Sequence, residues 1–141
     1  MLSLLGPLGA GKTAFVKGLA QGLGLDPAAV GSPTFVIACE YPLADGRRLA
    51  HVDLYRVGSE EELEAAGFLD LLVAGVVLAV EWADRLPEAL PGDHLELSIQ
   101  RDAAAGIEVR RILVRPTGPT ARELEARWSR ALVEEGIRVS R

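Results

Sequence analysis

Residues 6–13, Gly-Pro-Leu-Gly-Ala-Gly-Lys-Thr, have the types and spacing of a phosphate-binding loop and fit G-x-x-x-x-G-K-[ST] at every fixed position. Small residues in such a loop let backbone N–H groups converge on phosphate oxygens, and the following helix adds its positive N-terminal end. Lys12 is expected to reach the β- and γ-phosphates, and the Thr13 hydroxyl to bind Mg²⁺. The nucleotide contacts predicted in and beside this phosphate loop are Gly6, Leu8, Gly9, Ala10, Gly11, Lys12, Thr13 and Ala14.

An acidic residue directly follows the most apolar run of the chain. Residues 76–80 are continuously apolar, which is typical of a parallel strand covered on both faces. Glu81 comes next, so its carboxylate is expected at the carboxyl end of that strand, beside the phosphate loop. We therefore predict that Glu81 is a catalytic, Mg²⁺-directed acid. The adjacent Trp82 is predicted to contact nucleotide or partner, with ordinary packing as the alternative.

Polar residues alternate in the segment His-Val-Asp-Leu-Tyr-Arg at 51–56. On a strand His51, Asp53 and Tyr55 share one face, which suggests a site and not a core. Asp53 is predicted to hold a Mg²⁺-bound water or to act as base on the attacking water. A solvent-facing polar strand is the alternative for this segment, and His51 by itself is predicted to be a structural hydrogen-bonding residue.

A short hydroxyl-containing segment, Ser-Pro-Thr-Phe at 32–35, follows a loop. The hydroxyls of Ser32 and Thr34 are predicted to contact the nucleotide by sensing the γ-phosphate or Mg²⁺, as an order–disorder switch. The alternative is a turn that enters a strand.

The surrounding elements are expected to form a three-layer α/β fold of the P-loop NTPase type, whose mixed sheet has a parallel core and antiparallel hairpin strands. Capping boxes are expected to open the helices that begin near Ser59 and Thr120. Trp128 is expected in the core. The other expected elements are strands at 2–5 and 76–80, a helix after the phosphate loop that ends at Gly24, and hairpins formed by 34–40 with 49–54 and by 94–100 with 107–114.

Composition narrows the class of protein. The 141 residues are expected to form a single domain, with a linker and helix at 116–141. The formal charge of −5 and the scattered arginines argue against a nucleic-acid-binding face, so any role with RNA is expected to be indirect, through a partner. No apolar run is long enough to span a membrane. The single Cys39 is expected to be a small buried residue in a cytoplasmic protein.

The base of the nucleotide is indicated by a missing residue type. The chain contains no Asn, so the guanine-reading motif N-K-x-D cannot exist and ATP is favoured over GTP. No Arg-rich lid stands out, as it might in a small-molecule kinase, although Arg56 and Arg85 could each neutralise phosphate charge.

Together, the segments at 6–13, 32–35, 51–56 and 81–84 resemble the TsaE (YjeE) family of bacterial P-loop ATPases, in the family's order and approximate spacing. The resemblance covers about residues 2–115. It implies weak ATP hydrolysis with Mg²⁺, in support of tRNA threonylcarbamoyladenosine modification by a TsaD–TsaB-like partner complex. Mapped onto this chain, it implies that Lys12, Asp53 and Glu81 are catalytic and that Thr13 and Glu81 bind the metal.

The chain departs from the family at three points. Members usually carry about one helix and a lead-in before the first strand, and this chain starts inside that strand. Either the start codon is wrongly placed, or a segment that helps to cover the sheet is missing. Pro7 replaces an often acidic residue and Ala14 an often hydroxylated one. Two alternatives stay open: a small-molecule kinase and a non-hydrolysing nucleotide-binding switch.

Overall fold

The computed structural model describes residues 1–33 and 36–139, and its centre is a six-stranded sheet in the order β2-β3-β4-β1-β5-β6. Strands β3, β4, β1 and β5 run parallel to one another, while β2 and β6 pair antiparallel at the edges. The predicted mixed sheet with a parallel core is therefore confirmed. The strands are β1 (Leu2–Leu5), β2 (Ala38–Pro42), β3 (Arg48–Asp53), β4 (Val76–Glu81), β5 (Leu95–Arg101) and β6 (Arg110–Pro116).

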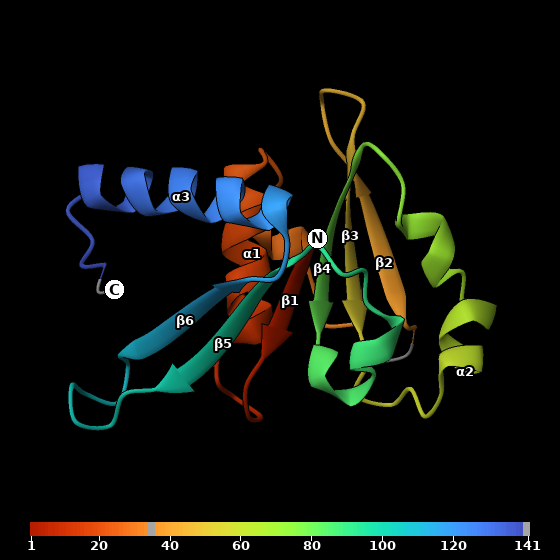
Figure 1. Ribbon diagram of the computed structural model, residues 1–141, viewed down its shortest axis with the longest axis horizontal. Coiled ribbons are helices and arrows are strands. Elements are labelled where there is room, and N and C mark those ends of the chain that lie inside the picture. Colours follow the sequence, from red (N-terminus) through yellow and green to blue (C-terminus); the bar gives the residue numbers. More distant parts are fainter. Residues whose placement is uncertain (34–35, 140–141) are drawn as a thin grey trace.

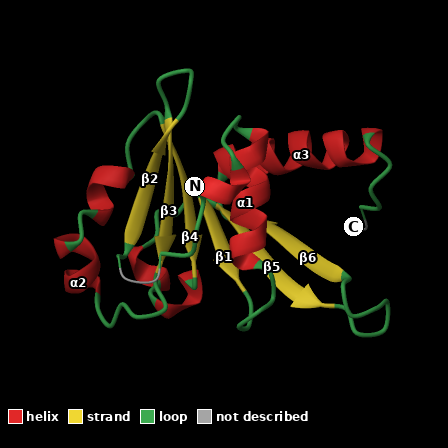
Figure 2. Ribbon diagram, turned by 180° about the vertical axis from the view of Figure 1, so that it is seen from behind, coloured by secondary structure: helices red, strands yellow, loops and turns green. Residues whose placement is uncertain are grey.

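Two apolar clusters on opposite faces of the sheet produce the expected three layers. Leu49 of β3 and Ala79 of β4 pack toward helix α1 (Lys12–Gly22), whereas Val52 and Val80 pack on the other face toward α2 (Glu60–Ala65). Because side chains alternate along a strand, one buried strand supplies both clusters. Figures 1 and 2 show α1 and α3 (Pro119–Glu134) on one face, with α2 near the β2 edge.

Short 3₁₀ turns connect several of these elements. They are η1 (Pro27–Ala29), η2 (Phe68–Leu71), η3 (Ala83–Arg85) and η4 (Pro87–Ala89). Within residues 1–33 and 36–139 no helix is both long and apolar enough to cross a membrane.

Local sequence signals account for two of the helices. Val16 and Ala20, one turn apart in α1, are fully buried, and Gly24 follows the helix with φ 85°. At α2 the predicted cap is present, because the Ser59 hydroxyl accepts a hydrogen bond from Glu62 N–H at 3.2 Å.

The predicted capping box at Thr120 is wrong. Helix α3 begins at Pro119, and its N-cap residue Gly118 contributes no side-chain hydrogen bond. Asp93, from the loop before β5, caps the helix instead by accepting from the N–H groups of Thr120 and Ala121, both at 2.9 Å. A residue distant in the sequence thus supplies the acceptor oxygens that the first turn requires.

Both hairpins form, with boundaries displaced from the predicted ones. Strand β2 begins at Ala38, four residues after the predicted start, and residues 34–35 lie outside the described part of the chain. Strand β6 begins at Arg110 instead of residue 107, because residues 102–109 form the connecting loop. The composition of a turn predicts that a hairpin forms, but it does not determine the residue at which strand pairing starts.

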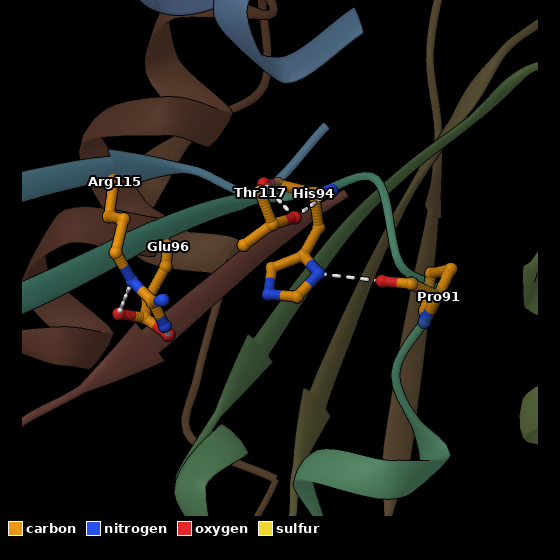
Figure 3. A network of polar contacts seen from close by, with 5 residues as sticks. All are labelled: Pro91, His94, Glu96, Arg115 and Thr117. Carbon is orange, nitrogen blue, oxygen red and sulfur yellow. Dashed lines mark hydrogen bonds and ion pairs between the residues drawn. The ribbon is translucent and has the colours of Figure 1, made fainter. Parts of the chain in front are cut away.

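A network of polar contacts joins the two strands of the β5–β6 hairpin near the start of β5 and the end of β6 (Figure 3). His94 N–H donates to the Thr117 hydroxyl at 2.8 Å, and the same hydroxyl donates to the His94 carbonyl at 2.8 Å. His94 Nδ1 donates to the Pro91 carbonyl at 2.7 Å. Arg115 binds Glu96 through two guanidinium nitrogens, at 2.8 and 2.6 Å. These contacts fix the register of β6 against β5.

Two expectations about burial need correction. Cys39 lies on the edge strand β2 and is only half-buried, because an edge strand leaves one side open to solvent. Trp128 packs edge-to-face on Phe15, with ring centroids 6.1 Å apart, but it is partly buried instead of fully enclosed. Helix α3 therefore contributes buried Ala121 to the core, while Trp128 covers the margin of the core.

Candidate nucleotide-binding site

The phosphate loop connects β1 to α1 at the carboxyl end of the parallel strands. Gly6 has φ 139°, and a Cβ at this position would lie 2.3 Å from the Ile99 carbonyl oxygen of the neighbouring strand. Gly11, the last residue before α1, has φ 116°. The fixed glycines of the motif are therefore required by the backbone path, which delivers the loop directly to the N-terminus of a helix.

Lys12 lies folded back over its own loop. Its ammonium donates to the carbonyls of Gly6 at 2.6 Å and Pro7 at 3.1 Å, and it lies 3.7 Å from the centroid of the Trp82 ring. Burial lowers the pKa of Lys12, and the nearby carboxylates, Glu81 foremost, partly offset that effect. The loop thus holds a positive charge whose present partners are neutral dipoles and an aromatic face.

Glu81 is the meeting point of three elements. It ends β4, and its Oε1 accepts from the Thr13 hydroxyl of α1 at 2.8 Å and from His51 Nε2 of β3 at 2.8 Å. His51 is fully buried, and its Nδ1 has no hydrogen-bond partner among the described residues. Because a carboxylate only accepts, the proton of the His51 contact is on Nε2, and the imidazole orients the glutamate.

Asp53 ends β3 directly beside Glu81, with which it is in register across the two parallel strands. Its Oδ1 accepts from Tyr55 N–H at 2.8 Å, and the Ser32 hydroxyl reaches Oδ2 at 3.5 Å. The structure thus brings Ser32 to Asp53 as a candidate switch residue, whereas Thr34 lies outside the described residues.

Tyr55 does not share the strand of His51 and Asp53, contrary to the prediction, because β3 ends at Asp53. Its ring instead packs against Trp82 in a tilted arrangement, with centroids 4.9 Å apart and an interplanar angle of 47°. Trp82 has φ 57°, and it is the only non-glycine residue with positive φ among residues 1–33 and 36–139. This conformation turns the chain sharply after Glu81 and directs the indole toward Lys12 and Tyr55.

A cavity of about 480 Å³ joins these groups. Most of the predicted contacts line it: Leu8, Gly9, Gly11, Lys12, Thr13, Ala14, Ser32, Asp53, Glu81 and Trp82. Gly6 and Ala10 do not line it, and Ala10 is buried. Val36, Ile37 and Val57 form an apolar wall of the cavity that was not predicted, because apolar residues of these types are equally typical of any core.

The donor set suits Mg²⁺ bound together with phosphates. The Thr13 hydroxyl and the Glu81 carboxylate are adjacent oxygen ligands of the kind that Mg²⁺ prefers. Across the described residues, no group of three or more His, Cys, Asp and Glu side chains is placed to hold a metal ion. Mg²⁺ commonly takes one or two protein ligands and completes its shell with water and substrate phosphate, so the residues present fit that ion.

The fold and this site together define a protein of the P-loop class. A sequence model described as "Threonylcarbamoyl adenosine biosynthesis protein TsaE" matches residues 1–112. The chain therefore belongs to the TsaE family, and the resemblance inferred from its motifs is confirmed.

Individual relatives agree with this assignment. The chain is 43% identical over 134 residues to a tRNA threonylcarbamoyladenosine biosynthesis protein TsaE of Streptomyces coelicolor, covering 93% of this chain and 84% of that one. It is 43% identical over 119 residues to the Bacillus subtilis protein of the same description, covering 84% and 70%. The crystal structure of Bacillus subtilis YdiB is similar with a TM-score of 0.66 at 36% identity, covering 92% of this chain and 76% of that chain.

Proposed function

We propose that this protein binds ATP with Mg²⁺ and hydrolyses it weakly, as an accessory subunit in tRNA threonylcarbamoyladenosine modification. The observation that carries the proposal is the convergence of the Thr13 hydroxyl and the His51 imidazole on one oxygen of Glu81, beside the buried ammonium of Lys12. Hydrolysis requires a phosphate cradle, a metal-directed acid and a cation near the transferred group, and these residues supply all three.

Each of these residues has a distinct role in the proposal. Lys12 leaves the carbonyls of Gly6 and Pro7 to bind phosphate, and backbone N–H groups of the loop bind the remaining oxygens. Thr13 and Glu81 would hold Mg²⁺, which when bound would neutralise charge on the phosphates. His51 keeps the Glu81 carboxylate oriented toward Thr13.

Asp53 is proposed as the residue that orients or deprotonates the attacking water. Its carboxylate lines the same cavity as Lys12 and Glu81, and it is only half-buried, so water reaches it. Ser32 contacts its second oxygen and is proposed to report on the occupancy of this position. Thr34 is proposed as a further nucleotide contact of the same segment, and Trp82 as one from the cavity wall.

The pathway comes from the relatives. The Streptomyces coelicolor and Bacillus subtilis proteins are described as acting in tRNA threonylcarbamoyladenosine biosynthesis. We propose that the chain serves the same pathway in the cytoplasm, as one domain working with a TsaD–TsaB-like complex. Its net charge of −5 supports contact with tRNA through those partners and not directly.

The test is tRNA modification over many turnovers, reconstituted with partner proteins and tRNA, with inorganic phosphate measured in parallel. Lys12→Ala and Glu81→Gln are each expected to lower phosphate release by about 10²-fold or more. The first removes a cation that neutralises charge in the transition state, and the second weakens the site that would hold Mg²⁺. Asp53→Asn is expected to lower it by about 10²-fold. Lys17→Ala, an exposed lysine of the same helix, serves as the matched control and is expected to behave like wild type.

The possible outcomes separate the candidate functions. Sustained modification by Lys12→Ala at the wild-type level would refute the ATPase proposal. Stoichiometric transfer of phosphate to a small acceptor would identify a kinase. Mg²⁺-dependent ATP binding without phosphate release, even with partners present, would identify a non-hydrolysing switch.

A further inference from the structure

Two arginines of the β5–β6 hairpin donate hydrogen bonds to backbone carbonyls of the phosphate loop. Arg110 Nε donates to the Ala10 carbonyl at 2.8 Å, and Arg101 Nη2 donates to the Gly9 carbonyl at 3.2 Å. The two arginines lie opposite each other in the register of β5 and β6. Neither belongs to the phosphate-loop motif, and Arg110 is separated from Ala10 by 100 positions in the sequence.

The Arg110 contact determines where one loop N–H points. The carbonyl of Ala10 and the N–H of Gly11 belong to the same planar, trans peptide group, so they point in opposite directions. Fixing the carbonyl toward Arg110 therefore fixes the Gly11 N–H on the other side. Gly11, with φ 116° and no side chain, has little intrinsic preference of its own. This peptide group could rotate readily without an external partner.

Arg110 is itself held rigidly. Its Nη1 donates to the carbonyls of Ile107 at 2.9 Å and Val109 at 3.2 Å, so one guanidinium joins the loop of the hairpin to the phosphate loop. A planar guanidinium can satisfy these three acceptors in fixed directions, whereas an ammonium cannot reproduce that fork. The contacts at the base of the hairpin keep β6 in register and so keep Arg110 opposite Ala10 (Figure 3).

Arg110 is not placed to bind phosphate directly. It lines a separate cavity of about 330 Å³ with Ala10, Gly11 and Ile99, and it does not line the candidate nucleotide cavity. Gly11 borders both cavities, so the loop separates Arg110 from the cavity that contains Lys12 and Thr13. Arg110 therefore acts on a phosphate ligand through the loop backbone and through the field of its charge, not through direct contact.

We propose that Arg110 is a positioning residue that holds the Ala10–Gly11 peptide group in its phosphate-binding orientation, with Arg101 as a second brace at Gly9. The proposal rests on the proposed function, because it assumes a phosphate ligand in the loop. Without Arg110, the loop occupies the binding orientation for a smaller fraction of the time, and the apparent affinity falls by that fraction.

The first measurement uses the nucleotide-free protein. ¹H–¹⁵N spectra of wild type, Arg110→Gln and Arg111→Gln report the Gly11 amide directly. Arg111 is the matched control, since it is the neighbouring residue of β6 and its side chain is exposed and paired with Asp102 at 3.0 Å. Arg110→Gln is expected to shift or broaden the Gly11 amide signal, and Arg111→Gln to leave it unchanged.

The second measurement is calorimetric binding of pyrophosphate and of Mg·ADP to the same proteins and to Arg110→Lys. Loss of a charge-assisted hydrogen bond that orders the loop is expected to weaken both ligands about tenfold in Arg110→Gln. The lysine variant keeps the charge without the planar fork, so its affinity should fall between those of wild type and Arg110→Gln. Arg111→Gln is expected to bind both ligands like wild type.

The outcomes distinguish this proposal from the proposed function. Wild-type affinity of Arg110→Gln for both ligands, or an unchanged Gly11 amide, would overturn the positioning role while leaving the ATP site intact. Weaker Mg·ADP binding with unchanged pyrophosphate binding would also overturn it, because the effect would not lie at the phosphates. If the folded wild-type protein binds neither pyrophosphate nor Mg·ADP, the proposed function itself is refuted.

Discussion

Replacing Gly6 with alanine tests whether the phosphate loop depends on the close approach of β1 to β5. The new Cβ would lie 2.3 Å from the Ile99 carbonyl oxygen and 3.3 Å from the Ala10 Cβ, at φ 139°. The backbone strain costs about 1–3 kcal/mol, and the steric overlap adds about 1–3 kcal/mol. We therefore expect Gly6→Ala to lower the free energy of unfolding by about 2–6 kcal/mol.

Gly18→Ala is the matched control, because the same substitution is made where nothing lies within 4 Å of the new Cβ. Gly18 is inside α1, where alanine is favoured over glycine by about 0.5–1 kcal/mol, so this variant should be more stable than wild type.

Urea unfolding, monitored by circular dichroism, measures the change in the free energy of unfolding of each variant. It is seen as a shift of the urea midpoint when the slope of free energy against urea concentration is the same as in wild type. A Gly6→Ala variant within about 1 kcal/mol of wild type would refute the steric argument, since natural folds have only about 5–15 kcal/mol in total. Destabilisation by Gly18→Ala would refute the backbone argument. Mg·ADP binding by a folded Gly6→Ala protein would show that the loop tolerates displacement.

Three further variants examine the surroundings of the site. His51→Leu leaves buried Glu81 without one of its two donors, so urea unfolding should show a loss of about 1–3 kcal/mol, and an unchanged midpoint would contradict the contact. In a Trp128→Phe background, Mg·ADP should change the emission of Trp82, because the loop lysine must leave its ring; constant emission would indicate that the lysine stays. Hydrogen bonds from the N–H groups of α3 lower the pKa of Asp93 in the folded protein. The stability that Asp93 adds is therefore fully present above the pKa of an unfolded aspartate, and it is lost as the pH falls through the lowered pKa of the folded state. Asp93→Ala should therefore reduce the dependence of the urea midpoint on pH between about pH 5 and pH 2, and an unchanged dependence would contradict the cap.

The parts of the site that could be predicted from the sequence are those set by local backbone chemistry. The spacing of Gly6, Gly11 and Lys12 encodes a loop that must precede a helix, and the structure has that loop. The apolar run before Glu81 encodes a buried parallel strand, which fixes the end of the sheet at which the carboxylate emerges. The parallel pairing of β3 and β4 then brings Asp53 beside Glu81, although the two residues are distant in the sequence.

Other features depend on contacts between distant segments, which no local pattern contains. Thr120 begins a plausible capping box, in which its hydroxyl would accept from the Glu123 N–H. The helix begins at Pro119 instead, and Asp93, from the loop before β5, accepts from the N–H groups of Thr120 and Ala121. In the sequence, Arg110 looks like any charged residue of an edge strand. Only the β5–β6 register, which is set by distant residues, shows that it contacts Ala10. Tyr55 continues the alternation of polar residues, but strand β3 ends at Asp53. Periodicity alone therefore placed Tyr55 on the strand incorrectly.

The resting contacts of the site involve the same donors that a nucleotide would require. The Lys12 ammonium is held by two carbonyls and the Trp82 ring, and the Thr13 hydroxyl is held by Glu81. Ligand affinity is therefore a difference between these contacts and those with phosphate and Mg²⁺, not a sum of new ones. Because burial already disfavours the charged form of Lys12, a phosphate that provides an opposite charge would raise its pKa. A phosphate would thus replace the neutral partners of Lys12, two carbonyls and the Trp82 ring, with an opposite charge, and this exchange favours anions in the loop.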